Sequence, residues 1–121
     1  IENIKLLAYS PLGFGILTGK YINNPPKNAR LSLWNVFDRY SNQNAKNATL
    51  KYVNLAKKYN LSPTQLALSF VNQQPFVASN IIGATNLSQL KENIKSIDIK
   101  LSKEILDEID IINKSHPNPA P

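Results

Sequence analysis

Two short apolar runs in this chain predict buried β-strands. The first, "IKLLAYS" at residues 4–10, ends at Pro11 and three nearby glycines, and the second, "FVASNII" at residues 76–82, ends at Gly83. Short apolar runs closed by proline or glycine are typical of strands that are buried on both faces of a parallel sheet. The pattern therefore predicts two such strands joined by a long connection.

Helical periodicity fills most of the remaining sequence. Apolar side chains recur at helical spacing in residues 45–59, and "SPTQ" at residues 62–65 combines an N-cap serine, a proline at the first helical position and a capping-box glutamine. Similar start signals stand at Asn86, with Gln89 three residues on, and at Ser102. The pattern predicts helices over residues 45–59, over residues 63–74, after Asn86 and after Ser102, with an extended link between the last two.

The connection after the first strand is unusually long. Residues 21–44 mix prolines, asparagines and large aromatic residues without a clear period, which predicts a loop excursion with a helical turn, and residues 116–121, "HPNPAP", form a tail that cannot be helical. The order of elements is that of an α/β protein. Two strands do not form a stable sheet alone, and the sequence contains no methionine, so we expect a fragment of a larger α/β fold.

Composition narrows the function classes. The chain has 121 residues, of which 42% are hydrophobic, and no apolar run reaches the roughly 18 residues needed to cross a bilayer, so we expect a soluble, cytoplasmic protein. The absence of cysteine and the single histidine, His116, argue against disulfides, zinc sites and histidine catalysis, and no metal ligand is predicted. The net charge of +6 is spread over scattered lysines, which favours a solvated surface over nucleic-acid binding.

One junction carries candidate chemistry. The stretch "SNIIGATNLSQLKEN" at residues 79–93 combines a strand end, a lone glycine and a helix start. Such a junction leaves backbone N–H groups pointing outward, where a phosphate can bind, but most junctions of this kind are only structural. Both interpretations stay open at this point.

Two motifs resemble those of the aldo-keto reductases: "AYSPLGFGILTGKY" at residues 8–21 and "IIGATNLSQLKENI" at residues 81–94. Members of this family are (β/α)₈ TIM barrels that use NADPH to reduce carbonyls, and the closer likeness is to the branch of potassium-channel β subunits and their bacterial relatives. The resemblance runs from about Ile4 to the end and covers the C-terminal third of the family. It implies strands seven and eight of a barrel, their helices and the closing C-terminal helix, incomplete on their own.

The resemblance also implies a set of cofactor-binding residues. An aromatic residue at the end of strand seven stacks on the nicotinamide ring, and it matches Tyr9. The loop that wraps the pyrophosphate matches Ser10, Pro11, Leu12 and Gly13, and basic positions that reach the phosphates match Lys20 and Arg30. The loop after strand eight matches Gly83, Ala84 and Thr85, and the positions that hold the adenosine 2′-phosphate and the adenine match Gln89 and Asn93.

Each of these residues also has a plainer interpretation. Tyr9 suits core packing at a strand end, Lys20 and Arg30 suit surface charges, and Gln89 and Asn93 suit the polar side of a surface helix. Many family members place an arginine where this chain has Gln89, so the preference for NADPH over NADH stays open.

The family's catalytic Asp, Tyr, Lys and His lie on the first four strands, which this chain lacks, so no catalytic residue is assigned and the fragment alone should be inactive. The complete parent protein would be an NADPH-dependent oxidoreductase that acts on a small-molecule aldehyde or ketone, without a nucleic-acid or membrane partner. The alternative is a truncated, non-enzymatic remnant that works as a nucleotide-binding or interaction module. In either case the strands would lack partners, so we expect self-association or complementation by the missing N-terminal part.

Overall fold

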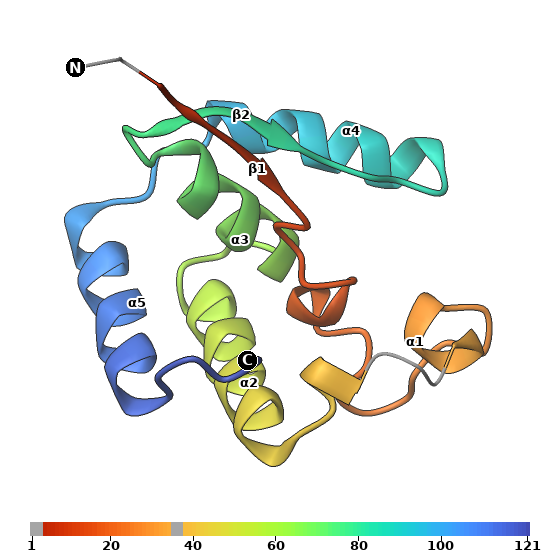
Figure 1. Ribbon diagram of the computed structural model, residues 1–121. Coiled ribbons are helices and arrows are strands. Elements are labelled where there is room, and N and C mark those ends of the chain that lie inside the picture. Colours follow the sequence, from red (N-terminus) through yellow and green to blue (C-terminus); the bar gives the residue numbers. More distant parts are fainter. Residues whose placement is uncertain (1–3, 35–37) are drawn as a thin grey trace.

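Two parallel strands lie at one side of the molecule. The structure is a computed structural model that describes residues 4–34 and 38–121. Strand β1 (Leu6–Tyr9) pairs in parallel with β2 (Val77–Ile81), with Leu6 opposite Val77 and Tyr9 opposite Ile81 (Figure 1). The predicted parallel pair is confirmed. Because the strands run in parallel, both chain segments that follow them start at the same edge of the sheet.

Four longer helices follow the predicted order. They are α2 (Gln43–Lys58), α3 (Pro63–Asn72), α4 (Leu87–Lys95) and α5 (Lys103–Ser115). Short turns of helix occur at η1 (Ile16–Thr18), α1 (Arg30–Leu33), η2 (Asp38–Tyr40) and η3 (Ser96–Asp98). Helix α3 packs against β2 and α4, and α2 packs against α3 and α5. Within the described ranges, none of the helices combines the length and the apolar character needed to cross a membrane.

The helix starts follow local capping chemistry. The predicted capping box is present, because Ser62 Oγ accepts from the Gln65 backbone N–H and Gln65 Oε1 accepts from the Ser62 backbone N–H. Helix α2 starts earlier than predicted, at Gln43, because Asn42 Oδ1 accepts from the Ala45 backbone N–H.

Two predicted boundaries are wrong. Helix α3 ends at Asn72 and not at residue 74, since the residue before a proline disfavours helical dihedrals and Pro75 follows Gln74. The link before α5 is not wholly extended, because η3 continues directly from α4 and buries Ser96.

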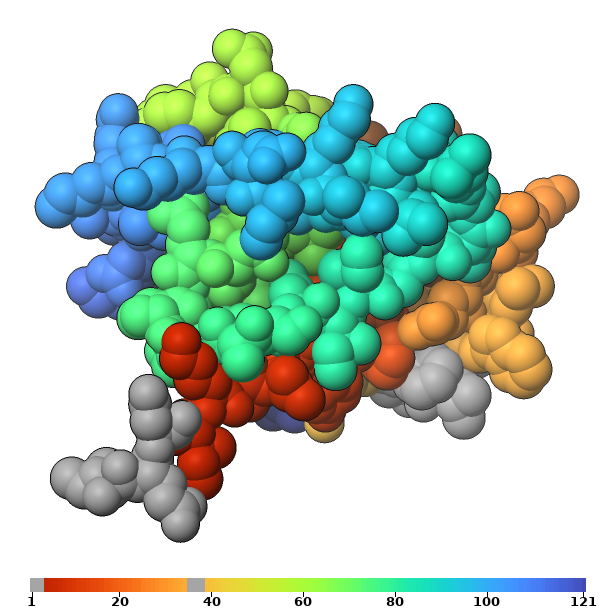
Figure 2. Space-filling model, turned by 90° about the horizontal axis from the view of Figure 1, so that it is seen from above, coloured from red at the N-terminus to blue at the C-terminus, as the bar shows by residue number. Residues whose placement is uncertain are grey.

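The core lies between helices and not around the strands. Leu55, Ala56, Leu66, Leu101, Ile105 and Ile109 form a buried cluster at the meeting point of α2, α3 and α5. The predicted burial of both strands is wrong for this chain: Leu7 is 59% exposed and Ile81 is 52% exposed. Seen from above, β1 in red and β2 in green lie at the surface (Figure 2). In the described sheet each strand has a hydrogen-bonded neighbour on one edge only. Helix α3 packs against β2.

Candidate functional site

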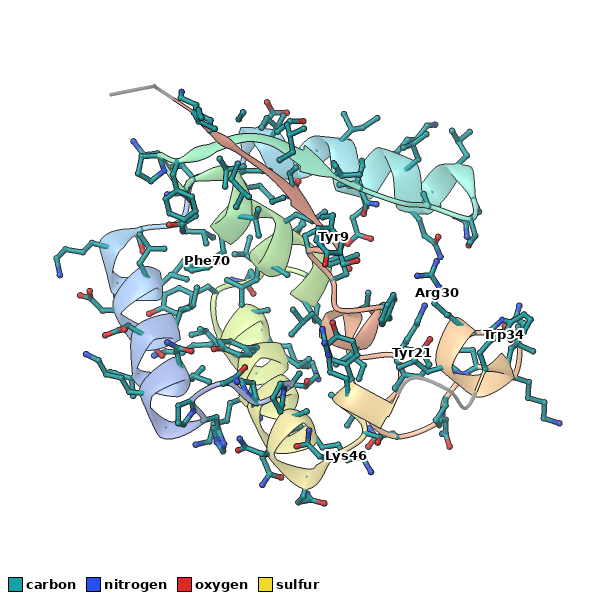
Figure 3. The ribbon with its side chains drawn as sticks, viewed as in Figure 1. Tyr9, Tyr21, Arg30, Trp34, Lys46 and Phe70 are labelled. Atoms are coloured by element: carbon teal, nitrogen blue, oxygen red, sulfur yellow. The ribbon has the colours of Figure 1, made fainter. Side chains whose placement is uncertain are left out.

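The candidate site lies where the two strands end. Tyr9, the last residue of β1, is paired with Ile81 at the end of β2, and its side chain is 79% exposed. The Tyr9 ring is therefore not packed against the described part of the chain. Figure 3 shows the ring at the carboxyl end of β1. The parallel pairing thus brings the segments 10–15 and 82–86 to one edge.

The segment after β1 folds back through consecutive tight turns. Ser10 and Gly13 both have φ of 53°, and the Gly13 N–H donates to Ser10 O at 3.0 Å. Leu12 O then accepts from the backbone N–H groups of Gly15 and Leu17. Left-handed dihedrals at two positions in four residues turn the chain sharply away from the sheet.

The segment after β2 is tied to helix α4 at two points. Thr85 donates both its backbone N–H and its hydroxyl to Gln89 Oε1, at 2.9 and 3.0 Å. One turn further along the helix, Asn93 Nδ2 donates to Gly83 O at 3.1 Å. Asn86 Oδ1 accepts from the Gln89 N–H as the N-cap, which confirms the predicted helix start.

The start of α4 is exposed and carries hydrogen-bond donors that the cap does not use. The first-turn N–H groups of a helix have no intrahelical acceptor, and the Asn86 cap satisfies that of Gln89 but not those of Leu87 and Ser88. Both Thr85 bonds use Gln89 Oε1, which leaves the Gln89 amide NH₂ as a further donor. This end of the helix therefore offers several donors and the positive end of the helix dipole.

The backbone conformation at Gly83 does not require a glycine. Its φ is outside the left-handed region, and an added Cβ would meet no atom within 4 Å. The strand can therefore turn here without a glycine, and the missing side chain only leaves the space beside the backbone empty.

Two cations belong to the excursion after β1. Lys20 Nζ lies 5.2 Å from the centroid of the Tyr21 ring, and Arg30 Cζ lies 5.4 Å from that of Phe14. Figure 3 shows Arg30 extending from α1 toward the segment that joins β2 to α4. The aromatic rings hold both positive charges on this side of the molecule.

The structure thus divides the predicted cofactor residues into groups. Tyr9, Ser10, Leu12 and Gly13 lie at the end of β1, and Gly83, Ala84, Thr85, Gln89 and Asn93 lie beside them after β2. Pro11 lies on another side, since it lines an apolar cavity of about 520 Å³ between α3 and α5 together with Phe70 and Leu106. Lys20 and Arg30 stand on the excursion.

A second cavity of about 500 Å³ separates the excursion from α2. Tyr21, Trp34, Tyr40 and Lys46 are among the side chains that line it. Trp34 and Phe37, two large aromatic residues of the excursion, are candidates for one wall of a substrate pocket. Trp34 lines this cavity, and Phe37 falls outside the described residues.

A separate charge cluster connects α2 with α5 away from the strand ends. The Tyr59 hydroxyl donates to Glu108 Oε1 at 2.6 Å, and Lys58 Nζ lies 2.7 Å from the same oxygen. The hydrogen bond to Glu108 raises the pKa of Tyr59 above its ordinary value, and the hydrogen bonds from Lys58 and Tyr59 lower the pKa of Glu108. This cluster supports the helix packing and takes no part in the strand-end site.

Sequence reasoning missed the polar residues that connect the helices next to the strand-end site. Asn72 and Ser96 join α3 to η3 and, through Asn93 O, to α4, and Ser96 is 2% exposed. Their signal in the sequence is weak: each is a small polar residue in a mostly apolar helix face.

The exposed edge, its outward donors and its flanking cations define an α/β chain with a candidate anion site at the carboxyl ends of parallel strands.

Comparison with known proteins places the chain in a family. Residues 2–114 match the model of the aldo/keto reductase family, and the chain belongs to that family. It is 48% identical over 121 residues to Protein tas of Escherichia coli (strain K12), a match that covers 99% of this chain and 35% of that protein.

More distant relatives carry related names. A probable voltage-gated potassium channel subunit beta of Oryza sativa subsp. japonica is 36% identical over 119 residues, which cover 93% of this chain and 36% of that protein. Probable aldo-keto reductase 1 of Glycine max is 37% identical over 107 residues, which cover 88% of this chain and 31% of that protein. The chain therefore spans about a third of the length of the curated relatives it matches, and the predicted family and branch are confirmed.

Proposed function

We propose that this chain is the NADPH-binding, C-terminal part of an oxidoreductase that reduces aldehydes or ketones. The observation that carries the proposal is the register of the sheet: Tyr9 opposite Ile81 brings an exposed aromatic ring and the donor-rich start of α4 to one edge. Family membership supports the same conclusion, because the chain matches the aldo/keto reductase model over residues 2–114.

The residues at this edge fit an anionic dinucleotide. The outward N–H groups of Leu87 and Ser88, the Gln89 amide and the positive end of the α4 dipole suit a phosphate. The empty space at Gly83 lets such a group approach the backbone closely. Lys20 and Arg30 add positive charge on the neighbouring excursion. Most of this donor set is neutral, so the choice between NADPH and NADH rests on Gln89 and these two cations.

Each residue then has a role in binding and orientation. When bound, the reduced nicotinamide would supply a hydride to the carbonyl carbon of the substrate. The exposed face of Tyr9 would support the nicotinamide ring and leave its opposite face toward the substrate. The segment after β2 would hold the phosphates, and no residue of this chain is assigned to proton transfer.

We further propose that β1 and β2 are neighbouring strands of a barrel whose other strands lie on another segment or polypeptide. The chain spans about a third of its relatives, and both strands expose apolar side chains, including Leu7 and Ile81. Parallel strands of this kind are normally covered on both faces. The partner of these strands would therefore be the remaining two-thirds of an aldo/keto reductase chain.

The first test is a calorimetric titration of the protein at its native length with NADPH and with NADH, in which we expect saturable binding of one dinucleotide per chain. The second test is an activity assay with an aldehyde. Once the remaining part of the barrel is present, the absorbance of NADPH should fall. Tyr9→Ala should weaken binding, whereas Tyr9→Phe, which keeps the ring, should not. A folded protein that binds neither dinucleotide would overturn the proposal.

A non-enzymatic nucleotide-binding or interaction module is the second candidate, favoured by the exposed apolar side chains of the strands, which offer a surface to another protein. The two candidates differ in turnover. A protein that binds NADPH but reduces no carbonyl, even after the complementary part of the barrel is added, is such a module.

A further inference from the structure

A relay of hydrogen bonds, buried at Ser96 and Asn93 and partly buried elsewhere, runs from strand β2 to the candidate site. Asn80 Nδ2 donates to Asn72 Oδ1 at 3.1 Å, and Asn72 Nδ2 donates to Ser96 Oγ at 3.2 Å. Ser96 Oγ then donates to Asn93 O at 2.6 Å, and Asn93 Nδ2 donates to Gly83 O at 3.1 Å. The relay connects β2, α3, η3 and α4 and ends on the first residue of the candidate phosphate segment.

The relay has one direction. The Ser96 hydroxyl has a single proton, which goes to Asn93 O, so the hydroxyl must accept from Asn72 Nδ2. The Asn72 amide is thereby oriented with its oxygen toward Asn80. Removing the Ser96 hydroxyl would leave the partly buried Asn72 Nδ2 without this acceptor, while Asn93 O would keep the Ser96 backbone N–H as its donor.

The burial of Asn93 bears directly on its role. Asn93 is only 4% exposed, and its Nδ2 is engaged by Gly83 O, whereas Gln89 one turn earlier is exposed. Resemblance implied that both residues face the adenosine end of the cofactor. In this structure Gln89 faces outward and Asn93 faces inward, toward the backbone of the segment after β2.

We propose that Asn93 is a positioning residue that fixes the Gly83 carbonyl, and that Asn72 and Ser96 set the geometry of the dinucleotide site without touching it. This inference rests on the proposed function. It follows from how few contacts hold residues 83–86: an added Cβ at Gly83 would meet no atom within 4 Å, and the Asn93 and Gln89 bonds tie the segment to α4. Loss of either tie therefore changes where the outward N–H groups point.

The test compares two buried serines in the protein at its native length. Ser96→Ala breaks the relay, whereas Ser69→Ala removes an equally buried hydroxyl that donates to Ser96 O and lies outside the relay. Asn93→Ala breaks the last bond. We expect Ser96→Ala and Asn93→Ala to weaken NADPH binding by up to about tenfold, the value of one hydrogen bond between a displaced N–H group and the ligand, and Ser69→Ala to leave it unchanged.

Two further readouts separate positioning from general stability. The loss should appear with 2′,5′-ADP, which carries the adenosine 2′-phosphate, and not with nicotinamide mononucleotide. Without any ligand, amide hydrogen exchange over residues 83–86 should be faster in Ser96→Ala and Asn93→Ala than in Ser69→Ala.

The outcomes are distinguishable. If the unsubstituted protein binds no NADPH, the proposed function fails, and hydrogen exchange alone decides whether the relay holds the segment. If it binds NADPH and all three variants show equal affinity and equal exchange, the relay is only structural and the positioning role is overturned.

Discussion

Gly83→Ala separates a glycine needed for binding from one needed for folding. The native φ of Gly83 is outside the left-handed region, and the new methyl group would have no neighbour within 4 Å. Alanine also reduces the conformational entropy of the unfolded chain, so the free energy of unfolding should stay constant or rise by up to about 1 kcal/mol. The methyl group would instead occupy the space through which a phosphate approaches the backbone.

The expected loss is therefore in affinity. A hydrogen bond between a backbone N–H and a charged group contributes about 1.5–3 kcal/mol, so displacing one should weaken NADPH binding about 10- to 100-fold. Calorimetric titration of the protein at its native length measures the affinity, and urea denaturation followed by circular dichroism measures the stability.

Gly19→Ala is the matched control. Gly19 has φ of 80°, and an added Cβ would lie 3.0 Å from Val53 Cγ2. The left-handed backbone costs about 1–2 kcal/mol and the overpacking about 1–3 kcal/mol, so the free energy of unfolding should fall by about 2–5 kcal/mol. The affinity of the folded protein should not change. The reasoning is refuted if Gly83→Ala destabilises the fold as much as Gly19→Ala, or if it leaves NADPH affinity unchanged.

Three further predictions concern stability. Ser62→Ala removes the capping box of α3 and should lower the free energy of unfolding by about 1 kcal/mol in urea denaturation. Ser62→Thr, which keeps a hydroxyl to cap the helix and to donate to Glu92, should largely avoid this loss. Leu68→Ala empties a fully buried position and should cost about 2–5 kcal/mol, against a much smaller loss for Leu68→Met. Stability should also fall as pH rises above about 10, since the raised pKa of Tyr59 favours its protonated form in the folded state, and as pH falls through the lowered pKa of Glu108. Tyr59→Phe should reduce the alkaline loss without removing it, because the pKa values of Tyr52 and Lys114 are also raised, and an unchanged alkaline loss would contradict the assignment to Tyr59.

Local chemistry made the helices predictable. The capping box at Ser62 and Gln65 and the caps at Asn86 and Ser102 are encoded within four residues, so their helices start where the sequence predicts. The cap at Asn42 was missed because it stands in a polar stretch without an apolar periodic residue beside it.

Tertiary contacts were beyond prediction from the sequence. The relay from Asn72 to Ser96 joins residues 24 positions apart, and no local pattern marks either residue as a partner of the other. The spacing of Gln89 and Asn93 placed them on one helix face, but burial depends on what packs against α4, so one side chain faces solvent and the other faces Gly83. The strand pattern predicted burial, and the exposed strands here are explained by the missing neighbours that the proposed barrel would supply.

The central claim is that the edge formed by the ends of β1 and β2 binds a phosphorylated nicotinamide dinucleotide. Titration calorimetry with NADPH on the protein at its native length, run in parallel on Tyr9→Ala, tests it most directly. The account predicts saturable binding of one NADPH per chain that Tyr9→Ala weakens. A folded protein that releases no heat and shows no saturation with NADPH would contradict it.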